Sequence, residues 1–135
     1  MKKEKSCGAV VYKIINNQIF FLIEKMQRGH FSIPKGHVEN NETEIETALR
    51  EIKEETNLEV ESIGMFINTF DYLSKSGKKS RQFNFEVMVK ETTNIFLTEH
   101  DEYSWLSLEE IEKNESITEE VKHTVQIFKY NNNLK

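Results

Sequence analysis

The sequence predicts an α/β domain in which a mixed β-sheet lies between α-helices. Segments rich in Val, Ile, Phe and Tyr occur on both sides of an amphipathic stretch that begins near residue 44. A second stretch near the C-terminus repeats apolar residues at helical spacing. The order of elements is then β-β-β-α-β-β-β-α, and helices with one apolar face bury that face on a sheet.

The first elements are two strands and a short extended segment. Residues 7–15 and 19–24 have strand composition, and Asn16-Asn17 between them predicts a hairpin turn. Residues 31–34 are expected to be extended, because Pro34 disfavours helix in the residue before it. A loop is expected over residues 35–41.

The first helix has recognisable ends. Thr43 with Glu46 forms a capping box, which predicts a helix start at about residue 44. Asn57 lies where the helix should stop, and asparagine tolerates the left-handed conformation of such a stop. The apolar stripe expected to face the core consists of Ile45, Ala48, Leu49 and Ile52.

The second half of the chain continues this alternation. Residues 60–70 and 81–90 predict strands joined by a polar loop over 74–80, and 103–106 predict a further short strand. Ser107 with Glu110 and Ser116 with Glu119 predict two helix starts. Four residues of the last helical segment are expected in the core: Ile117, Val121, Val125 and Phe128.

Composition limits the class of protein. The 135 residues predict one domain, 1–135, and a net charge of -5 argues against an extended nucleic-acid surface. No apolar run is long enough for a membrane span or a secretory signal. The single cysteine, Cys7, lies in an apolar run and is expected to be buried rather than nucleophilic. We therefore expect a cytoplasmic protein without a membrane partner, and a monomer is favoured.

The middle of the chain carries a spaced set of residues with chemical potential: Gly36, Glu42, Arg50, Glu51, Ile52, Glu54, Glu55 and Leu58. Glu51, Glu54 and Glu55 share one helix flank at the edge of the apolar stripe. Like charges four residues apart repel, so this flank favours a cation, and hard oxygen ligands suit Mg²⁺. Arg50 is placed to bridge to Glu42 or Glu54.

This pattern, G-x5-E-x7-R-E-I-x-E-E-x-N-L, resembles the Nudix box, with Asn57 where glycine is usual. The resemblance implies the Nudix fold, an α/β/α sandwich, and Mg²⁺- or Mn²⁺-dependent hydrolysis of a nucleoside diphosphate linked to another moiety. Residues 7–10, 34–39, 46–51 and 99–106 are similar to the asymmetrical diadenosine tetraphosphate hydrolases. That subgroup splits its dinucleotide substrate to ATP and AMP.

The resemblance also implies roles at the reacting phosphates. Metal ions would be held by Glu51, Glu54 and Glu55, by the carbonyl of Gly36 and by Glu99, which lies beyond the box. Either Glu54 or Glu51 would be the general base. Arg50 would hold the acidic cluster in place.

A further group of residues is expected to bind the nucleotide. Lys35 and His37 flank Gly36 and are candidates for phosphate contacts, as are Lys79 and Arg81 for the distal phosphates. The candidates for stacking on adenine are Tyr72, Tyr103 and Phe31. Trp105 and Phe83 are interpreted as packing residues.

Two other functions remain open at this stage. The same chemistry can act on RNA 5′ ends or nucleoside triphosphates, although RNA-end activity favours a more basic surface than this chain has. A nucleotide sensor built on the same fold is the non-enzymatic alternative. Such a sensor would be expected to lose metal ligands, whereas Glu51, Glu54 and Glu55 are all present.

Overall fold

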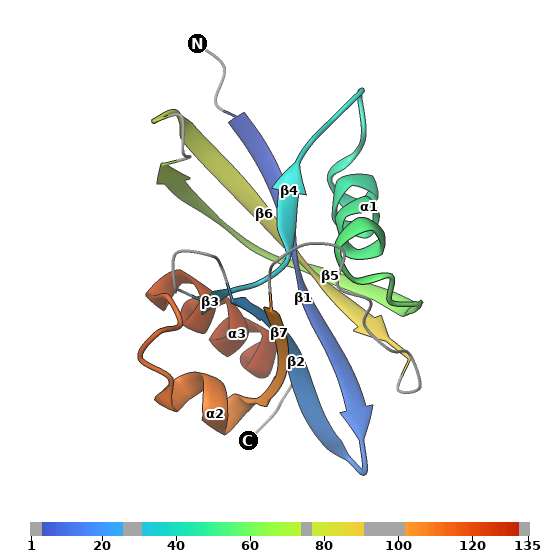
Figure 1. Ribbon diagram of the computed structural model, residues 1–135, viewed down its shortest axis with the longest axis vertical. Coiled ribbons are helices and arrows are strands. Elements are labelled where there is room, and N and C mark those ends of the chain that lie inside the picture. The colour runs from blue at the N-terminus through green and yellow to red at the C-terminus, as the bar shows by residue number, and fades with distance from the viewer. Residues whose placement is uncertain (1–3, 26–30, 74–76, 91–101, 133–135) are drawn as a thin grey trace.

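The computed structural model describes residues 4–25, 31–73, 77–90 and 102–132, and within them seven strands form one sheet between helices (Figure 1). The elements are β1 (Glu4–Ile15), β2 (Gln18–Lys25), β3 (Phe31–Ser32), β4 (Lys35–His37), α1 (Glu44–Thr56), β5 (Val60–Leu73), β6 (Lys79–Val89), β7 (Glu102–Ser107), α2 (Leu108–Lys113) and α3 (Glu119–Asn131). The predicted α/β class is confirmed.

The sheet is mixed, as predicted. Its strand order is β3-β2-β1-β6-β5, with β4 paired to β1 and β7 paired to β2. The β1–β6 pair is parallel and the other pairs are antiparallel. The β1–β2 hairpin turns at Asn16 and Asn17, whose φ angles of 51° and 66° suit a two-residue turn that needs positive φ at both positions.

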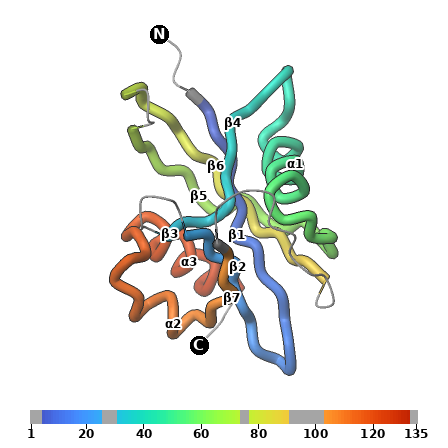
Figure 2. The backbone as a smooth tube through the Cα atoms, in the orientation of Figure 1, coloured from blue at the N-terminus to red at the C-terminus, as the bar shows by residue number. Residues whose placement is uncertain are grey.

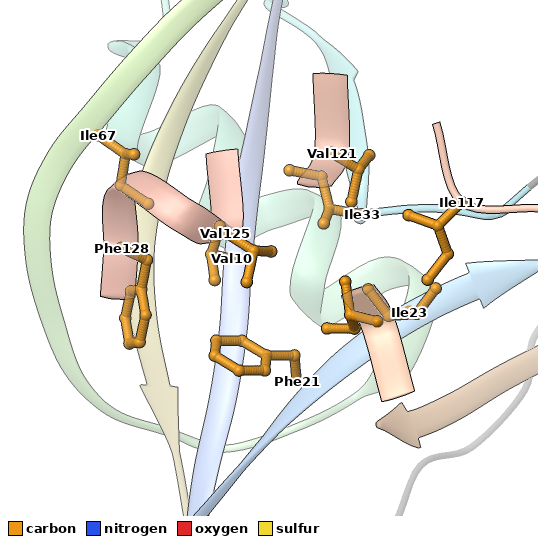
Figure 3. Close-up of a cluster of buried hydrophobic side chains, with 10 residues drawn as sticks. Val10, Phe21, Ile23, Ile33, Ile67, Ile117, Val121, Val125 and Phe128 are labelled. Carbon is orange, nitrogen blue, oxygen red and sulfur yellow. The ribbon is translucent and has the colours of Figure 1, made fainter. Parts of the chain in front are cut away.

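The helices cover opposite faces of this sheet (Figures 1 and 2). Side chains alternate between faces along a strand, so neighbours in sequence belong to different cores. Ala9 and Val11 pack with Ile52 of α1, whereas Val10 between them packs with Val125 and Phe128 of α3. Figure 3 shows the side chains of α3 pointing toward Val10 and the strands. We call these the α1 face and the α3 face.

Helix α1 begins and ends as predicted, but its buried stripe is rotated. The Thr43–Glu46 capping box is formed, and Asn57 adopts the left-handed conformation with φ 56°. The buried residues are Thr47, Ala48, Ile52 and Thr56. Ile45 is 39% exposed and Leu49 is only partly buried, so the prediction was wrong for these two.

The rotation has a local cause. The hydroxyls of Thr47 and Thr56 donate to the carbonyls of Thr43 and Ile52 one turn earlier, at 3.1 and 2.6 Å. A threonine whose hydroxyl is satisfied by its own helix can be buried at little cost. Hydrophobic spacing alone does not reveal this.

Two boundaries also differ from expectation. Helix α3 is capped by Thr118, not Ser116, because the backbone of Ser116 is engaged elsewhere: its N–H donates to Asn114 and its carbonyl accepts from Phe31. The predicted loop 35–41 begins with β4, whose residues pair with β1. The Ser107 capping box of α2 is confirmed.

Candidate active site

Arg50 of α1 organises a cluster of acceptors on the α1 face. Its guanidinium donates to Glu42 at 2.8 Å, to Glu51 at 2.9 Å and to Glu54 at 3.1 Å. It also donates to the backbone carbonyl of His37 at 2.9 Å, which ties α1 to β4. Both bridges predicted for Arg50 are therefore present. The planar fork of five donors suits this many partners, and it holds the pKa of Glu42 down at about 2.

Gly36 lies against Glu51. In β4, Gly36 pairs with Cys7, whose side chain belongs to the α1 face, so Gly36 is directed toward α1. A Cβ atom at Gly36 would overlap the carboxylate carbon of Glu51. Glycine is therefore needed here for close approach of the backbone to a carboxylate.

The environment of Glu55 favours its neutral form. Burial, the negative charge of Glu24 and a hydrogen bond with Glu51 raise the pKa of Glu55 well above its usual range, whereas the hydroxyl of Tyr103, which donates to it at 3.1 Å, opposes that shift. Glu24 was not among the predicted residues. It is 4% exposed on β2, and a carboxylate at the end of the apolar run 19–23 was the available signal.

The donor set fits a hard divalent cation in its chemistry. The hydrogen bond with Glu51 that raises the pKa of Glu55 indicates that the two carboxyl groups lie close together, and a divalent cation between them would neutralise both. Within the described residues, no three His, Cys, Asp or Glu side chains converge as they stand. Arg50 holds one oxygen of Glu51 and one of Glu54, so cation binding requires these side chains to turn.

A second group of predicted residues meets on the α3 face. The ammonium of Lys35 lies 4.2 Å from the ring centre of Tyr72, and the hydroxyl of Tyr72 donates to Ser6 at 3.1 Å. Burial lowers the pKa of Lys35, and the charge of Glu24 opposes that shift. His37 pairs with Ser6 in the sheet and its side chain is exposed. Strand β4 thus directs Gly36 toward one face and its two neighbours toward the other.

Other predicted residues are not brought to these groups. Lys79 and Arg81 are exposed, and strand alternation directs them to the face opposite Tyr72. Arg81 pairs with Asp71 at 2.9 Å. Phe31 packs at the border of the apolar core on the α3 face. Glu99 lies outside the described residues.

The residues interpreted as structural are confirmed as such. Trp105 and Phe83 each pack beside a buried cluster, with Lys13 and Lys5 over their rings at 4.1 and 4.8 Å. Cys7 is fully buried, and burial raises the pKa of its thiol to about 11.

The sequence reasoning also missed a row of buried polar side chains along β6. These residues are Ser80, Gln82, Asn84 and Glu86, and they alternate with Arg81, Phe83 and Phe85. Such alternation is usually interpreted as one solvent-facing side of a strand. Only the tertiary structure shows that the polar side is covered.

Comparison with known proteins bears on this geometry. Residues 6–126 match the NUDIX domain family. The chain belongs to the Nudix family. It is 30% identical to the asymmetrical bis(5′-nucleosyl)-tetraphosphatase of Mus musculus, a match that covers 78% of this chain and 80% of the mouse protein. A Caenorhabditis elegans protein of the same name is also 30% identical, with the same shares covered.

Solved structures agree. The C. elegans Ap4A (diadenosine tetraphosphate) hydrolase superposes with a TM-score of 0.80 at 26% identity, and its binary complex with 0.82 at 27%. Each match covers 96% of this chain and 98% of the other. The chain is thus a Nudix hydrolase, a class that uses divalent metal ions. Among the described residues, none forms a helix long and apolar enough to cross a membrane.

Proposed function

We propose that this Nudix hydrolase cleaves diadenosine tetraphosphate asymmetrically, to ATP and AMP. The main observation that supports this proposal is the Arg50 cluster, which holds Glu51 and Glu54 next to Gly36 at the edge of the sheet. The substrate is supported by the relatives, which bear the names of enzymes acting on this class of dinucleotide. A cytoplasmic, monomeric protein remains our expectation.

Glu51, Glu54, Glu55 and the carbonyl of Gly36 would hold Mg²⁺ or Mn²⁺. When bound, the metal would activate water and neutralise charge on the phosphoryl oxygens. Arg50 keeps the carboxylates oriented and joins them to β4 through the carbonyl of His37. Glu99 as a further ligand remains a prediction.

The two candidates for the general base differ in access to water. Glu54 is 58% exposed, whereas Glu51 is 15% exposed and packed against Gly36. A base that takes a proton from an attacking water must reach that water within hydrogen-bond distance. This difference supports Glu54 as the base and Glu51 as the buried ligand.

The supported nucleotide contacts lie on the α3 face. Lys35 would bind phosphate oxygens, because its charge is partly buried on the strand that carries Gly36, and His37 would assist from the same strand. Tyr72 offers an aromatic face for adenine. Tyr103 is better assigned to orienting Glu55, since its hydroxyl is bonded there. Roles for Lys79, Arg81 and Phe31 remain predictions.

The test is to incubate the purified protein with diadenosine tetraphosphate and Mg²⁺ and to resolve the products. We expect equal ATP and AMP, lost on chelation. ADP as sole product would contradict asymmetrical cleavage. Hydrolysis of RNA 5′ ends or nucleoside triphosphates instead would keep the chemistry and reject the substrate. Inactivity on the whole panel would favour a nucleotide sensor.

Variants separate chemistry from folding. Glu54→Ala and Glu55→Ala are expected to lower kcat by orders of magnitude while circular dichroism stays unchanged. Glu61→Ala, on an exposed position of β5, is the matched control and should retain activity. Near-normal turnover in both helix variants would refute the assignment.

A further inference from the structure

The buried polar row on β6 contains a directed chain of hydrogen bonds. Gln82 donates from Nε2 to Asn84 Oδ1 at 2.6 Å, and Asn84 donates from Nδ2 to Asn68 Oδ1 on β5 at 3.0 Å. Asn68 donates from Nδ2 to the hydroxyl of Thr124 on α3 at 3.1 Å. We call these four residues the amide relay. Each amide nitrogen donates to a side-chain oxygen of the next residue in the chain of bonds.

Helix α3 sets the direction of the relay. The hydroxyl of Thr124 has one proton, and its contact with the carbonyl of Glu120, 2.8 Å, is shorter than its contact with Asn68 Oδ1, 3.4 Å. The Thr124 oxygen therefore accepts from Asn68. Each amide upstream must then present its oxygen toward Gln82 and its nitrogen toward α3. The relay ends in one oxygen, Gln82 Oε1.

That terminal oxygen is buried and has no hydrogen-bond partner in the described part of the chain. Gln82 is 0% exposed. The site is also built around the amide: a Cβ at Gly8 would lie 2.5 Å from Gln82 Nε2 and 2.7 Å from Asn84 Oδ1. Glycine at position 8 leaves the space that the relay occupies. A buried carbonyl without a donor is costly, which points to a donor supplied by a ligand.

An aromatic side chain crosses β6 near the residue that carries this oxygen. Tyr72 pairs with Ser80 in the sheet, yet its hydroxyl reaches Ser6, the partner of Gln82 on the other side of β6. The side chain of Tyr72 therefore crosses β6 next to Gln82. The ammonium of Lys35 lies on the same ring at 4.2 Å. A neutral acceptor next to an aromatic face suits a nucleobase that carries an amino group.

We propose that Gln82 Oε1 accepts a hydrogen bond from the exocyclic amino group of a purine base that stacks on Tyr72. An acceptor at this place disfavours a phosphate oxygen or a base carbonyl, because neither has a proton to donate. Lys35 has a flexible stem, so it can leave the ring for a phosphate group while the base takes its place. The inference rests on the proposed function for its substrate class and adds base specificity to it.

The experiment compares dinucleoside tetraphosphates that carry adenosine or purine riboside, which differ only in the exocyclic amino group at C6. For the wild type we expect kcat/KM to be about tenfold higher for the amino base, the size of one good neutral hydrogen bond. Gln82→Met keeps the length of the side chain and removes the acceptor, so this ratio should fall to about one. A wild type without preference would overturn the proposal, whether or not the variant folds.

A structural role for Gln82 predicts a different result. Loss of packing would lower kcat/KM for both substrates by the same factor and leave the ratio unchanged, which would also overturn the proposal. Asn132→Ala is the matched control, because it removes a bond to Glu86 in the same β6 row but outside the relay. It should destabilise the protein without changing the ratio.

Two further measurements are needed. One distinguishes a ribose hydroxyl from a base amino group as the donor, and the other distinguishes failure of this inference from failure of the proposed function. A ribose hydroxyl offers the same chemistry, so 2′-deoxy and 3′-deoxy substrates are compared as well. If Gln82→Met abolished discrimination between the ribose and deoxyribose substrates and left the base ratio unchanged, the base assignment would be overturned. Binding of AMP and of purine riboside 5′-monophosphate by calorimetry gives the same ratio without turnover. If diadenosine tetraphosphate is not cleaved but AMP is preferred, the proposed function fails and this inference stands.

Discussion

The two faces of the sheet handle polar groups in opposite ways. On the α1 face, Arg50 binds charged carboxylates at the half-exposed edge of α1. On the α3 face, neutral amides of β5 and β6 are bonded into a relay whose members Gln82 and Asn84 are fully buried. Charged groups near the surface stay solvated and can exchange partners. Neutral amides can be removed from water at a far lower cost in free energy than charges. The difference suits reaction on one face and recognition on the other.

The two faces should also contribute differently to the free energy of unfolding. Ion pairs near the surface contribute little to the free energy of unfolding, because solvent screens them. A buried amide that loses its partner costs about 1–3 kcal/mol. Changes on the α1 face should therefore affect activity more than folding, and changes in the relay should affect folding more than chemistry.

Among variants that keep all the carboxylates, the largest effect on activity is expected from Gly36→Ala. The added methyl group would overlap the Glu51 carboxylate and displace it, and a shift of about 1 Å at a reacting centre can cost about 100-fold in rate. The measurement is kcat with a thermal melt of the same sample. Gly64→Ala is the control, because its Cβ would crowd Glu86, which is not part of the Arg50 cluster. Equal activity in the two variants would contradict the assignment.

Arg50→Lys should have the next largest effect. Lysine keeps the charge but cannot donate to three carboxylates and a carbonyl together. Loss of groups that orient metal ligands typically costs about 10- to 100-fold. We expect lower kcat/KM and a higher metal concentration at half activity. Lys113→Ala, which breaks an exposed pair with Glu109, should change neither.

Asn84→Ala tests the relay as a source of stability. It leaves Gln82 and Asn68 without their shared partner. The free energy of unfolding should therefore fall by about 1–3 kcal/mol for each polar group left without a hydrogen bond. Urea denaturation measures the change. Ser104→Ala, at an exposed position of β7, is the reference. A loss no greater than that of the reference would show that the relay is not needed for folding.

The smallest effect concerns pH. Arg50 lowers the pKa of Glu42 to about 2 in the folded protein, below its usual value of 4.5. Stability from this contact is therefore fully present above the unfolded pKa and is lost as pH falls through the folded one. The window lies between about 4.5 and about 2. Glu42→Gln should flatten the acid limb of a melting-temperature profile there, and an unchanged limb would contradict this.

The sequence by itself determined the features that depend on near neighbours. The Thr43–Glu46 box, the left-handed Asn57 and the Asn16-Asn17 turn were all predictable, because caps and turns are closed by bonds over two to four residues. The bridge from Arg50 to Glu54 follows in the same way from helix geometry. The alternating order of strands and helices set the fold class.

Only the tertiary structure decided which polar residues are buried and what they meet. Glu24 on β2 approaches Glu55 on α1, and Tyr72 crosses β6 to reach Ser6. The relay joins β5, β6 and α3, whose residues Asn68 and Thr124 are far apart in sequence. Alternation along one strand shows that two sides differ but not which side is covered. Coverage depends on strands and helices brought together by the whole fold, so no local pattern contains it.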